Sequence, residues 1–503
     1  MKRLLNVLHP FLIALSPVLF LYAHNIAQVL VRDTFISSAV VLLLAALALG
    51  LFLVLFRNLQ KAAIATSLFL ILFFSYGHAF ALKEEYNIRL RYLVGLFGVL
   101  FFGGLITIAR LRRDMKEVAR SLTIFASLMI AISLVSIASF HIRASGSLRN
   151  GEDHLVNSGD SNKQKPDIYY FMLDGYASEW SFNTVFQYDN SAFYKDLRKR
   201  EFYVVSKSRS NYPNTTLSLP SMLNMDYDQN LISGERLSAE TFNHRRLIQD
   251  NKVMTFLKSQ GYKYVHAGSW WDPTYYNRNA DININRGFMP EFVSTLYKSV
   301  ALGPLDIQLF DTRKEQYNRL LYQLEELKKV PQMGEPTFVF AHFNLAPYVF
   351  REDGSFLPPE EHGEQLRLEN LKKNYPRQLA YLNVRMLELI DVILAKSERP
   401  PVIILQSDHG SRILSGNIGD IETADELSPE DTKERLRNFT ALYLPDGGSK
   451  LAYDTMSNVN TFRIVLSHYF GQNYPLLPDR SYITVPGKHY ELFDVTGIAK
   501  YEK

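Results

Sequence analysis

The stretch Ile403–Gly410, which reads Ile-Ile-Leu-Gln-Ser-Asp-His-Gly, indicates both the fold and the site. The apolar run Val402–Leu405 is typical of a buried strand. Open α/β sheets bind ligands just outside the carboxyl ends of their strands, and here the strand is followed by Asp408 and His409. An adjacent carboxylate and imidazole are suited to binding a metal ion. The alternative is a simple turn, in which Gly410 supplies a positive φ.

A second apolar run with the same ending opens the polar half of the chain. Asp167 is followed by Ile-Tyr-Tyr-Phe-Met-Leu, and the run ends at Asp174 and Gly175. We expect this strand end to lie beside that of the Asp408 strand, where the two carboxylates would share one ion. A turn made by Asp174 and Gly175 is again the alternative.

A segment dense in hydroxyl groups, Ser208–Asn224, leads into an expected helix at about Leu217–Leu223. Such a cluster is most often a helix N-cap. It can also present a nucleophile beside the positive end of the helix dipole, where a phosphate would be held. A threonine hydroxyl ionises near neutral pH only if a metal or a base lowers its pKa. Thr215 is therefore the expected fourth metal ligand and the attacking oxygen.

The composition divides the chain into two unlike parts. At 503 residues there is room for more than one domain. Residues 1–142 are strongly apolar, whereas 143–503 have the composition of a soluble domain. The net charge of +4 is small and dispersed, so nothing in the composition indicates nucleic-acid binding. The absence of cysteine excludes disulfides, thiol catalysis and zinc–thiolate sites, and it suits an oxidising compartment.

The apolar part contains five stretches near the length of about 20 residues that spans a bilayer. They are Pro10–Leu30, Thr34–Phe56, Ala62–Leu82, Tyr92–Ala109 and Leu122–Phe140. A cleaved signal peptide would explain only the first of them. The loops on one side carry nine Lys and Arg residues and those on the other side carry four, which places the amino terminus in the cytoplasm. Five crossings then put the remainder outside.

These observations predict three regions. Residues 1–142 form a five-helix transmembrane domain, and the polar segment 143–165 is a linker. Residues 166–503 form the extracytoplasmic catalytic domain. Its alternating strand and helix patterns predict an α/β domain with a mostly parallel central sheet covered by helices on both faces. Helical spacing at Tyr317–Lys328 and Leu379–Lys396 predicts two of these covering helices.

Three motifs together resemble the alkaline phosphatase/sulfatase superfamily. They are the strand-end Asp174, the pattern Thr-x-x-Ser-x-Pro-x-Met at Thr215–Met222, and Ser-Asp-His-Gly at Ser407–Gly410. With five membrane helices, the chain looks like the membrane-bound phosphotransferases of that superfamily, the lipoteichoic acid synthases and the lipid A phosphoethanolamine transferases. The resemblance covers essentially the whole chain. It implies a multi-pass protein of the bacterial cytoplasmic membrane, with its catalytic domain on the periplasmic side.

The resemblance also implies a reaction. In that family a threonine takes a phospho-head-group from a phospholipid as a covalent intermediate. The motif puts this threonine at Thr215, with Thr216 as the alternative, and the metal ligands at Asp174, Thr215, Asp408 and His409. The expected donor is a phospholipid and the expected acceptor an envelope glycan or lipid. A phosphodiesterase or sulfatase-like hydrolase on the same site and an inactive scaffold in polysaccharide assembly are the alternatives.

Three departures from the family patterns limit the prediction. The segment Ser218–Met222 has Met where sulfatases need Arg, which speaks against sulfatase activity. The first ligand is often Glu in the transferases, and here it is Asp174. Members with two metals carry extra histidines, but the segment Asn344–Tyr348 has none, and none follows His409 until His468. We therefore expect one divalent ion, Mn²⁺, Mg²⁺ or Zn²⁺, and no organic cofactor.

Four further residues are candidates for substrate binding. A strand ending in His266 precedes Tyr276 and Arg278, and these loosely match the residues that hold phosphoglycerol in lipoteichoic acid synthases. A guanidinium binds phosphate well because it can donate two parallel hydrogen bonds. His342 also ends an apolar strand, and we expect it to contact the phosphate. The alternatives are a surface arginine, core aromatic residues and a core histidine.

Overall fold

The chain forms two compact units. One comprises Met1–Gly146 and Met289–Asp311, and the other Ser147–Phe288 and Thr312–Lys503. The computed structural model describes residues 7–26, 29, 31–85, 89–111, 115–146, 165–233, 244–287, 291–301, 311–358, 368–414, 427–485 and 488–501. Most of the expected linker 143–165 lies outside the described residues, so the expected domain limits stay predictions.

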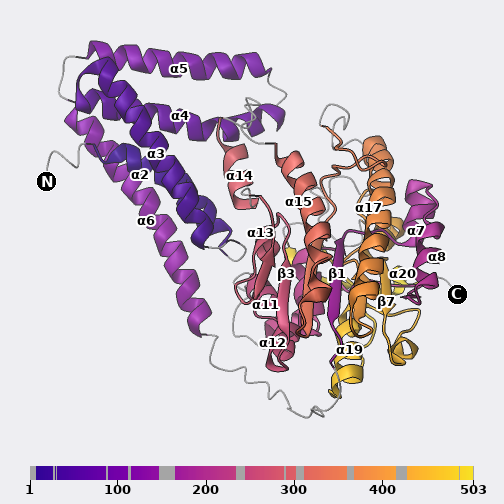
Figure 1. Cartoon of the computed structure of the whole chain (residues 1–503). Helices are drawn as coiled ribbons and strands as arrows, with labels where there is room; N and C mark the ends of the chain where they lie inside the picture. Colours follow the sequence, from indigo (N-terminus) through magenta and orange to yellow (C-terminus); the bar gives the residue numbers. More distant parts are fainter. Residues whose placement is uncertain are drawn as a thin grey trace. The chain divides into compact units, whose positions relative to one another are not determined.

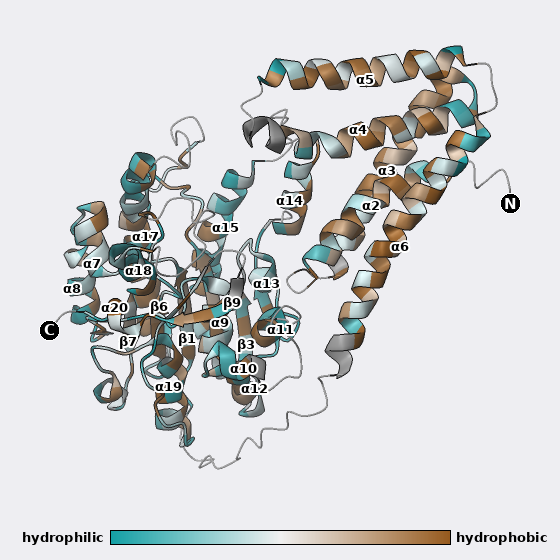
Figure 2. Cartoon of the chain, turned by 180° about the vertical axis from the view of Figure 1, so that it is seen from behind, coloured by the Kyte–Doolittle hydropathy of each residue, from teal (hydrophilic) through white to brown (hydrophobic). Residues whose placement is uncertain are grey.

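The first unit is built of apolar helices (Figure 2). They are α2 (His9–His24), α3 (Val31–Phe56), α4 (Leu59–Glu85), α5 (Leu90–Arg110) and α6 (Lys116–Gly146). Four of them, α3 to α6, are long and apolar enough to cross a membrane. The first expected span forms α2, which has only 16 residues. At 1.5 Å per residue it is about 24 Å long, against about 30 Å of hydrocarbon. The five-helix prediction is thus confirmed for four helices only.

A helix from the middle of the chain belongs to this first unit. Helix α14 (Glu291–Ser299) buries Phe292 and Leu296 in the same apolar cluster as residues of α2 and α3. The amide of Ala301, just beyond it, donates to the carbonyl of Phe73 in α4 at 2.9 Å. Only a glycine fits at position 77 of α4, because a Cβ there would lie 2.2 Å from the Ser299 carbonyl oxygen. The sequence gives no sign of this docking.

The second unit is organised around a seven-stranded sheet of order β2-β7-β6-β1-β5-β3-β4. Its strands are β1 (Ile168–Asp174), β2 (Tyr203–Val204), β3 (Lys263–Ala267), β4 (Ile282–Ile284), β5 (Thr337–Asn344), β6 (Val402–Gln406) and β7 (Thr440–Tyr443). Strand β1 pairs in parallel with β5 and β6, and β3 pairs in parallel with β4 and β5. In this sheet, as far as its residues are described, the antiparallel pairs are those that β7 makes with β2 and β6. The expected mostly parallel sheet is confirmed.

Helices cover both faces of the sheet, which explains why β1 is apolar throughout. Alternate side chains of a strand point to opposite faces. Tyr169 and Phe171 pack with residues of α15 (Thr312–Leu327) and α17 (Leu368–Lys396), which run alongside β1 in Figure 1. Tyr170 and Met172 pack on the other face with residues of α9 (Thr215–Asn224), α12 (Lys252–Ser259) and α19 (Thr461–Phe470). Buried on both faces, parallel strands become continuous apolar runs.

The expected helices are present with shifted ends. Helices α15 and α17 contain most of the two predicted covering helices, and α9 begins at Thr215, two residues before the predicted Leu217. The side chain of Asn214 caps α9 by accepting a hydrogen bond from the amide of Leu217 at 3.1 Å. The remaining helices and strands complete the unit. They are α7 (Glu179–Ser181), α8 (Ser191–Lys199), α10 (Asp228–Ser233), α11 (His244–Gln249), α13 (Asp272–Tyr275), α18 (Pro429–Leu436), α20 (Thr496–Ala499), β8 (Tyr482–Val485) and β9 (Lys488–Asp494).

Candidate functional site

The sheet brings the two predicted carboxylates to one edge. Strands β1 and β6 run side by side in parallel, with Ile168 opposite Val402 and Met172 opposite Gln406. Asp174 is the last residue of β1, and Asp408 comes two residues after the end of β6. Both side chains therefore emerge at the carboxyl ends of neighbouring strands, where open α/β sheets bind their ligands.

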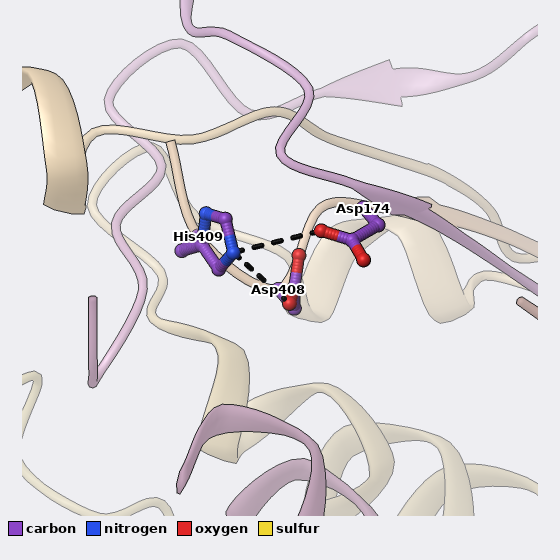
Figure 3. A group of neighbouring side chains, drawn as sticks. All are labelled: Asp174, Asp408 and His409. Carbon is purple, nitrogen blue, oxygen red and sulfur yellow. Dashed lines mark ion pairs between the residues drawn. The ribbon is translucent and has the colours of Figure 1, made fainter. Parts of the chain in front are cut away.

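Three side chains converge at this edge (Figure 3). His409 Nε2 lies 3.5 Å from Asp174 Oδ1 and 3.5 Å from Asp408 Oδ2. One potential ligand atom of each residue lies within 4.8 Å of those of the other two. Two carboxylate oxygens and one imidazole nitrogen at these separations form a donor set that fits a single divalent cation.

The backbone around the cluster holds it in this arrangement. The amide of Gly175 donates to Asp408 Oδ1 at 3.1 Å. Gly175 has a φ of +69°, which a side-chain-bearing residue rarely adopts. His409 Nδ1 lies 2.7 Å from the carbonyl oxygen of Gly410. Because a carbonyl can only accept, Nδ1 carries the proton, and in the neutral ring Nε2 presents its lone pair to the carboxylates.

Two polar atoms of the cluster are buried without a hydrogen-bond partner among the described residues. They are Asp408 Oδ2 and His409 Nε2, and the two residues are only 0% and 2% exposed. An unsatisfied buried polar atom costs about 1–3 kcal/mol, and more if it is charged. A cation bound between these atoms would satisfy both, so the residues present fit a divalent metal ion.

The pKa values of the two carboxyl groups are shifted in opposite directions. Burial raises the pKa of Asp408, and the charge of Asp174 adds to this. Burial would also raise the pKa of Asp174, but a hydrogen bond from His342 and the charges of His342, His409 and Arg412 outweigh it and lower the pKa. Burial lowers the pKa of His409, which leaves the imidazole neutral and able to bind a metal at neutral pH.

Thr215, the predicted nucleophile, lies next to Asp408. It is the first residue of α9 and is half-buried. Its hydroxyl interacts with the Asp408 carboxyl by a hydrogen bond, which lowers the pKa of that acid. The neighbouring Thr216 is also half-buried. The amino-terminal end of a helix dipole favours an anion at this place. The four predicted ligands thus come from β1, α9 and the loop after β6.

His342 contacts the cluster through Asp174. Its side chain is fully buried, its Nε2 is 3.1 Å from Asp174 Oδ2, and its Nδ1 is 2.6 Å from Thr274 Oγ1. With both ring nitrogens engaged, His342 orients Asp174, as the partners of metal ligands usually do. Its predicted contact with a substrate phosphate stays a prediction.

The other three predicted substrate ligands lie on the β3 side of the sheet. His266 is buried, with Nε2 2.7 Å from the Thr274 carbonyl oxygen and Nδ1 3.2 Å from the Tyr264 hydroxyl. Burial lowers its pKa to about 4, so the ring is neutral. Arg278 is exposed and ion-paired with Asp250 at 2.5 Å. Tyr276 is half-buried. Their substrate roles stay predictions.

Supporting residues that sequence reasoning missed surround the loop after β6. Asn458 Nδ2 donates to the carbonyls of Ser407 and Asp408, at 2.9 and 3.2 Å. The buried Glu434 of α18 accepts hydrogen bonds from the loop immediately after His409. Arg412, within that loop, has an exposed side chain. Its place three residues after His409 was the only signal in the sequence, since Asn458 and Glu434 lie in unremarkable polar segments.

Comparisons with known proteins give structural matches only. No family model and no curated protein matches the chain. The carboxy-terminal periplasmic domain of EcEptC from Escherichia coli in complex with zinc has 13% identity and a TM-score of 0.43, covering 67% of this chain and 94% of that one. The corresponding domain of phosphoethanolamine transferase EptC from Campylobacter jejuni has 14% identity and a TM-score of 0.39, covering 60% and 89%.

A protein of the alkaline phosphatase superfamily from Vibrio parahaemolyticus also matches, with 13% identity and a TM-score of 0.38, covering 69% of this chain and 80% of its own. The solved structures similar to this chain thus include periplasmic domains of phosphoethanolamine transferases and a member of the alkaline phosphatase superfamily. Identities of 13–14% with TM-scores below 0.5 carry no information about what this chain acts on.

Proposed function

We propose that the chain is a membrane-anchored, metal-dependent phosphotransferase that uses Thr215 as its nucleophile. It moves a phospho-head-group, phosphoglycerol or phosphoethanolamine, from a phospholipid to an envelope glycan or lipid. One observation carries this proposal. Asp408 Oδ2 and His409 Nε2 are buried without hydrogen-bond partners in the described part of the chain, beside a carboxylate and the threonine that begins α9.

The proposed reaction has two steps. A divalent ion, when bound, supplies the positive charge that lowers the pKa of the attacking hydroxyl and offsets the charge of the phosphate. Thr215 Oγ forms a bond to phosphorus while the bond to the lipid alcohol breaks, and the hydroxyl proton passes to that alcohol. An acceptor hydroxyl then forms a new bond to phosphorus. The bond to Thr215 breaks, and the proton of the acceptor returns to Thr215.

Several features of the chain support the roles of its residues in these steps. Asp174, Asp408 and His409 hold the ion, and His342 orients Asp174 through the 3.1 Å contact. His409 stays neutral because burial lowers the pKa of its ring. The helix dipole of α9 favours the anionic phosphorus group beside Thr215. Electrostatic preorganisation of this kind is the main contribution of proteins to phosphoryl transfer.

The apolar helices support a location of the chain in a membrane. We propose that α2 crosses this membrane as well, as a fifth helix. Among the described residues, four helices are long enough to span a membrane, and an even number of crossings would leave the catalytic unit on the same side as the amino terminus. Helix α2 buries Ala14 and Val18 in the apolar cluster of this unit, as a helix inside a membrane bundle would. With five crossings, the distribution of Lys and Arg puts the catalytic unit outside the cytoplasmic membrane.

The main test detects the covalent intermediate. Full-length protein in detergent, loaded with divalent metal, is incubated with phosphatidylglycerol or phosphatidylethanolamine, and peptides are analysed by mass spectrometry. We expect an adduct on Thr215 whose mass identifies the head group, and no adduct in Thr215→Ala. Thr216→Ala is the matched control, and loss of the adduct in that variant instead would assign the nucleophile to Thr216. No adduct on either residue would refute the proposal.

A hydrolase is the second candidate. The outcome of the second step depends on which acceptor reaches the covalent intermediate, and in a hydrolase that acceptor is water. Comparing products with and without an added glycan acceptor distinguishes the two: transfer requires the acceptor, whereas a phosphodiesterase releases the head group into water at the same rate in both. A catalytically inactive scaffold would show equal metal content in wild type and Asp408→Ala, which metal analysis detects.

A further inference from the structure

A rigid loop carries Arg412 close to the metal-ligand cluster. The buried carboxylate of Glu434 accepts hydrogen bonds from the Ser411 hydroxyl and the Ile413 amide, both at 2.8 Å, and from the Leu414 amide at 2.9 Å. These contacts fix the backbone on both sides of Arg412. Gly410 packs just as tightly, since a Cβ there would lie 2.0 Å from the Glu434 carbonyl oxygen.

The side chain of Arg412 is exposed while its neighbours in the loop are buried. Within the described residues, its guanidinium has no hydrogen bond and no ion pair. An exposed arginine is usually a solvated surface residue. The backbone of this one, however, is anchored by hydrogen bonds to Glu434, and it lies only three residues after His409. Its position in the chain therefore keeps the guanidinium in the neighbourhood of the cluster, and no described residue forms a hydrogen bond or ion pair with it.

The electrostatic effects of Arg412 show that its charge reaches the cluster. Its positive charge contributes to the lowered pKa of Asp174 and to that of His409. It also acts on Arg435, whose pKa burial and this charge lower to about 10. A second cation beside a buried one is unfavourable unless anions offset it, and the charges of Glu434 and Asp431 offset this pair only in part, since the pKa of Arg435 stays lowered. The surroundings of Arg412 are thus suited to receiving a negatively charged group.

We propose that Arg412 is the phosphate-binding cation of this site: its guanidinium donates paired hydrogen bonds to the phosphoryl oxygens of the phospholipid head group while Thr215 attacks. The inference rests on the proposed function and deepens it, because it names the residue that recognises the phosphate. A planar guanidinium matches two phosphate oxygens at once, which an ammonium cannot do. Arg278, the arginine predicted for this role, is already paired with Asp250.

The proposal predicts that Arg412→Ala affects phosphate binding and metal binding differently. Phosphate binding weakens, because a charged hydrogen-bond donor is lost, by about tenfold or more. Binding of the divalent ion stays the same or strengthens, because a positive charge near its ligands is removed. A variant that merely distorted the site would weaken both. Arg412→Lys retains the charge but not the paired donors, so it recovers only part of the phosphate affinity.

The experiment measures the dissociation constant of inorganic phosphate for full-length, metal-loaded protein by isothermal titration calorimetry, and separately that of the metal. Arg198→Ala is the matched control, because Arg198 is an exposed arginine on α8. We expect Arg198→Ala to bind phosphate as the wild type does. A second arm measures displacement of phosphate by micelles containing phosphatidylglycerol and by micelles containing only neutral diacylglycerol. Displacement by the first alone identifies a lipid head group as the source of the phosphate.

Failure of this inference differs from failure of the proposed function. Unchanged phosphate affinity in Arg412→Ala, an equal loss in Arg198→Ala, or a joint loss of metal and phosphate binding would overturn the role of Arg412, even if Thr215 forms its adduct. Conversely, Arg412-dependent phosphate binding without any adduct on Thr215 would support the role of Arg412 and refute the transferase.

Discussion

The ends of β1 and β6 look alike in sequence but differ in the structure. Strand β1 ends in Asp174, Asp408 follows two residues after the end of β6, and the two side chains belong to one cluster. Asp174 retains 14% exposure of its side chain and has a buried histidine beside it, and its pKa is lowered. Asp408 is fully buried, one of its oxygens has no hydrogen-bond partner among the described residues, and its pKa is raised.

This difference teaches that two carboxylates proposed to bind one ion need not be stabilised in the same way. The charge of Asp174 is stabilised by the protein itself, through His342. The charge of Asp408 is stabilised less well: the Gly175 amide, the Thr215 hydroxyl and the neighbouring histidines favour it, but burial and the charge of Asp174 outweigh them and raise the pKa. Asp174 is thus stabilised in its charged form by the protein alone. The charge of Asp408 is unfavourable in the metal-free cluster, and this favours the binding of a cation.

The largest predicted effect is a loss of transfer activity that is the same for both aspartates. Asp174→Asn and Asp408→Asn each take one charged ligand from the ion, so we expect metal-dependent transfer to fall by roughly a thousandfold in both. Head-group transfer from labelled phospholipid at saturating metal measures this loss. Retention of activity in either variant would show that the remaining residues suffice to hold the ion.

A smaller effect, on metal affinity, is expected from replacing His342, which contacts Asp174 but not Asp408. His342→Leu removes the hydrogen bond that holds Asp174 in place, and we expect metal affinity to fall by about 10–100-fold. His342→Gln keeps a donor of similar reach and should recover much of this loss. Metal titration followed by calorimetry gives both constants. If His342→Leu binds metal as tightly as the wild type, His342 does not orient the ligand.

The smallest effect is on the folding stability of the metal-free protein. It distinguishes the two aspartates most clearly, because the two substitutions should change the stability in opposite directions. Asp408 has a raised pKa, so its ionisation opposes folding, and this cost grows as the pH rises from the unfolded value of 3.8 through the raised folded value. Asp174 has a lowered pKa, so its contribution is present above 3.8 and lost as the pH falls through the folded value. At pH 7 Asp408→Asn should therefore stabilise the metal-free protein and Asp174→Asn destabilise it, by about 1 kcal/mol each.

Thermal unfolding of the metal-free proteins between pH 3 and pH 8 tests this contrast. The two variants should diverge from the wild type in opposite directions at neutral pH and converge toward it in acid. Shifts of the same sign at pH 7 would mean that the two carboxylates have the same environment, contrary to their contacts.

The sequence was sufficient to predict those parts of the site that follow from a local pattern of apolar and polar residues. Apolar runs that end in Asp174 and Asp408 predicted both strands, their carboxyl ends and their proximity. It was not sufficient for Glu434, which fixes the Arg412 loop from a helix that looks like any charged surface helix. The start of α9 was misplaced because a cap by Asn214 cannot be distinguished from the other polar residues before Thr215.

The docking of α14 has a consequence for isolating the catalytic unit. The chain passes between the two units three times, after residues 146, 288 and 311. A fragment that merely omits the first 146 residues would keep α14, with Phe292 and Leu296 deprived of the apolar residues that bury them. Exposed apolar surface of this kind promotes aggregation. A soluble catalytic fragment therefore needs two changes, removal of the amino-terminal helices and replacement of 289–311 by a short polar turn.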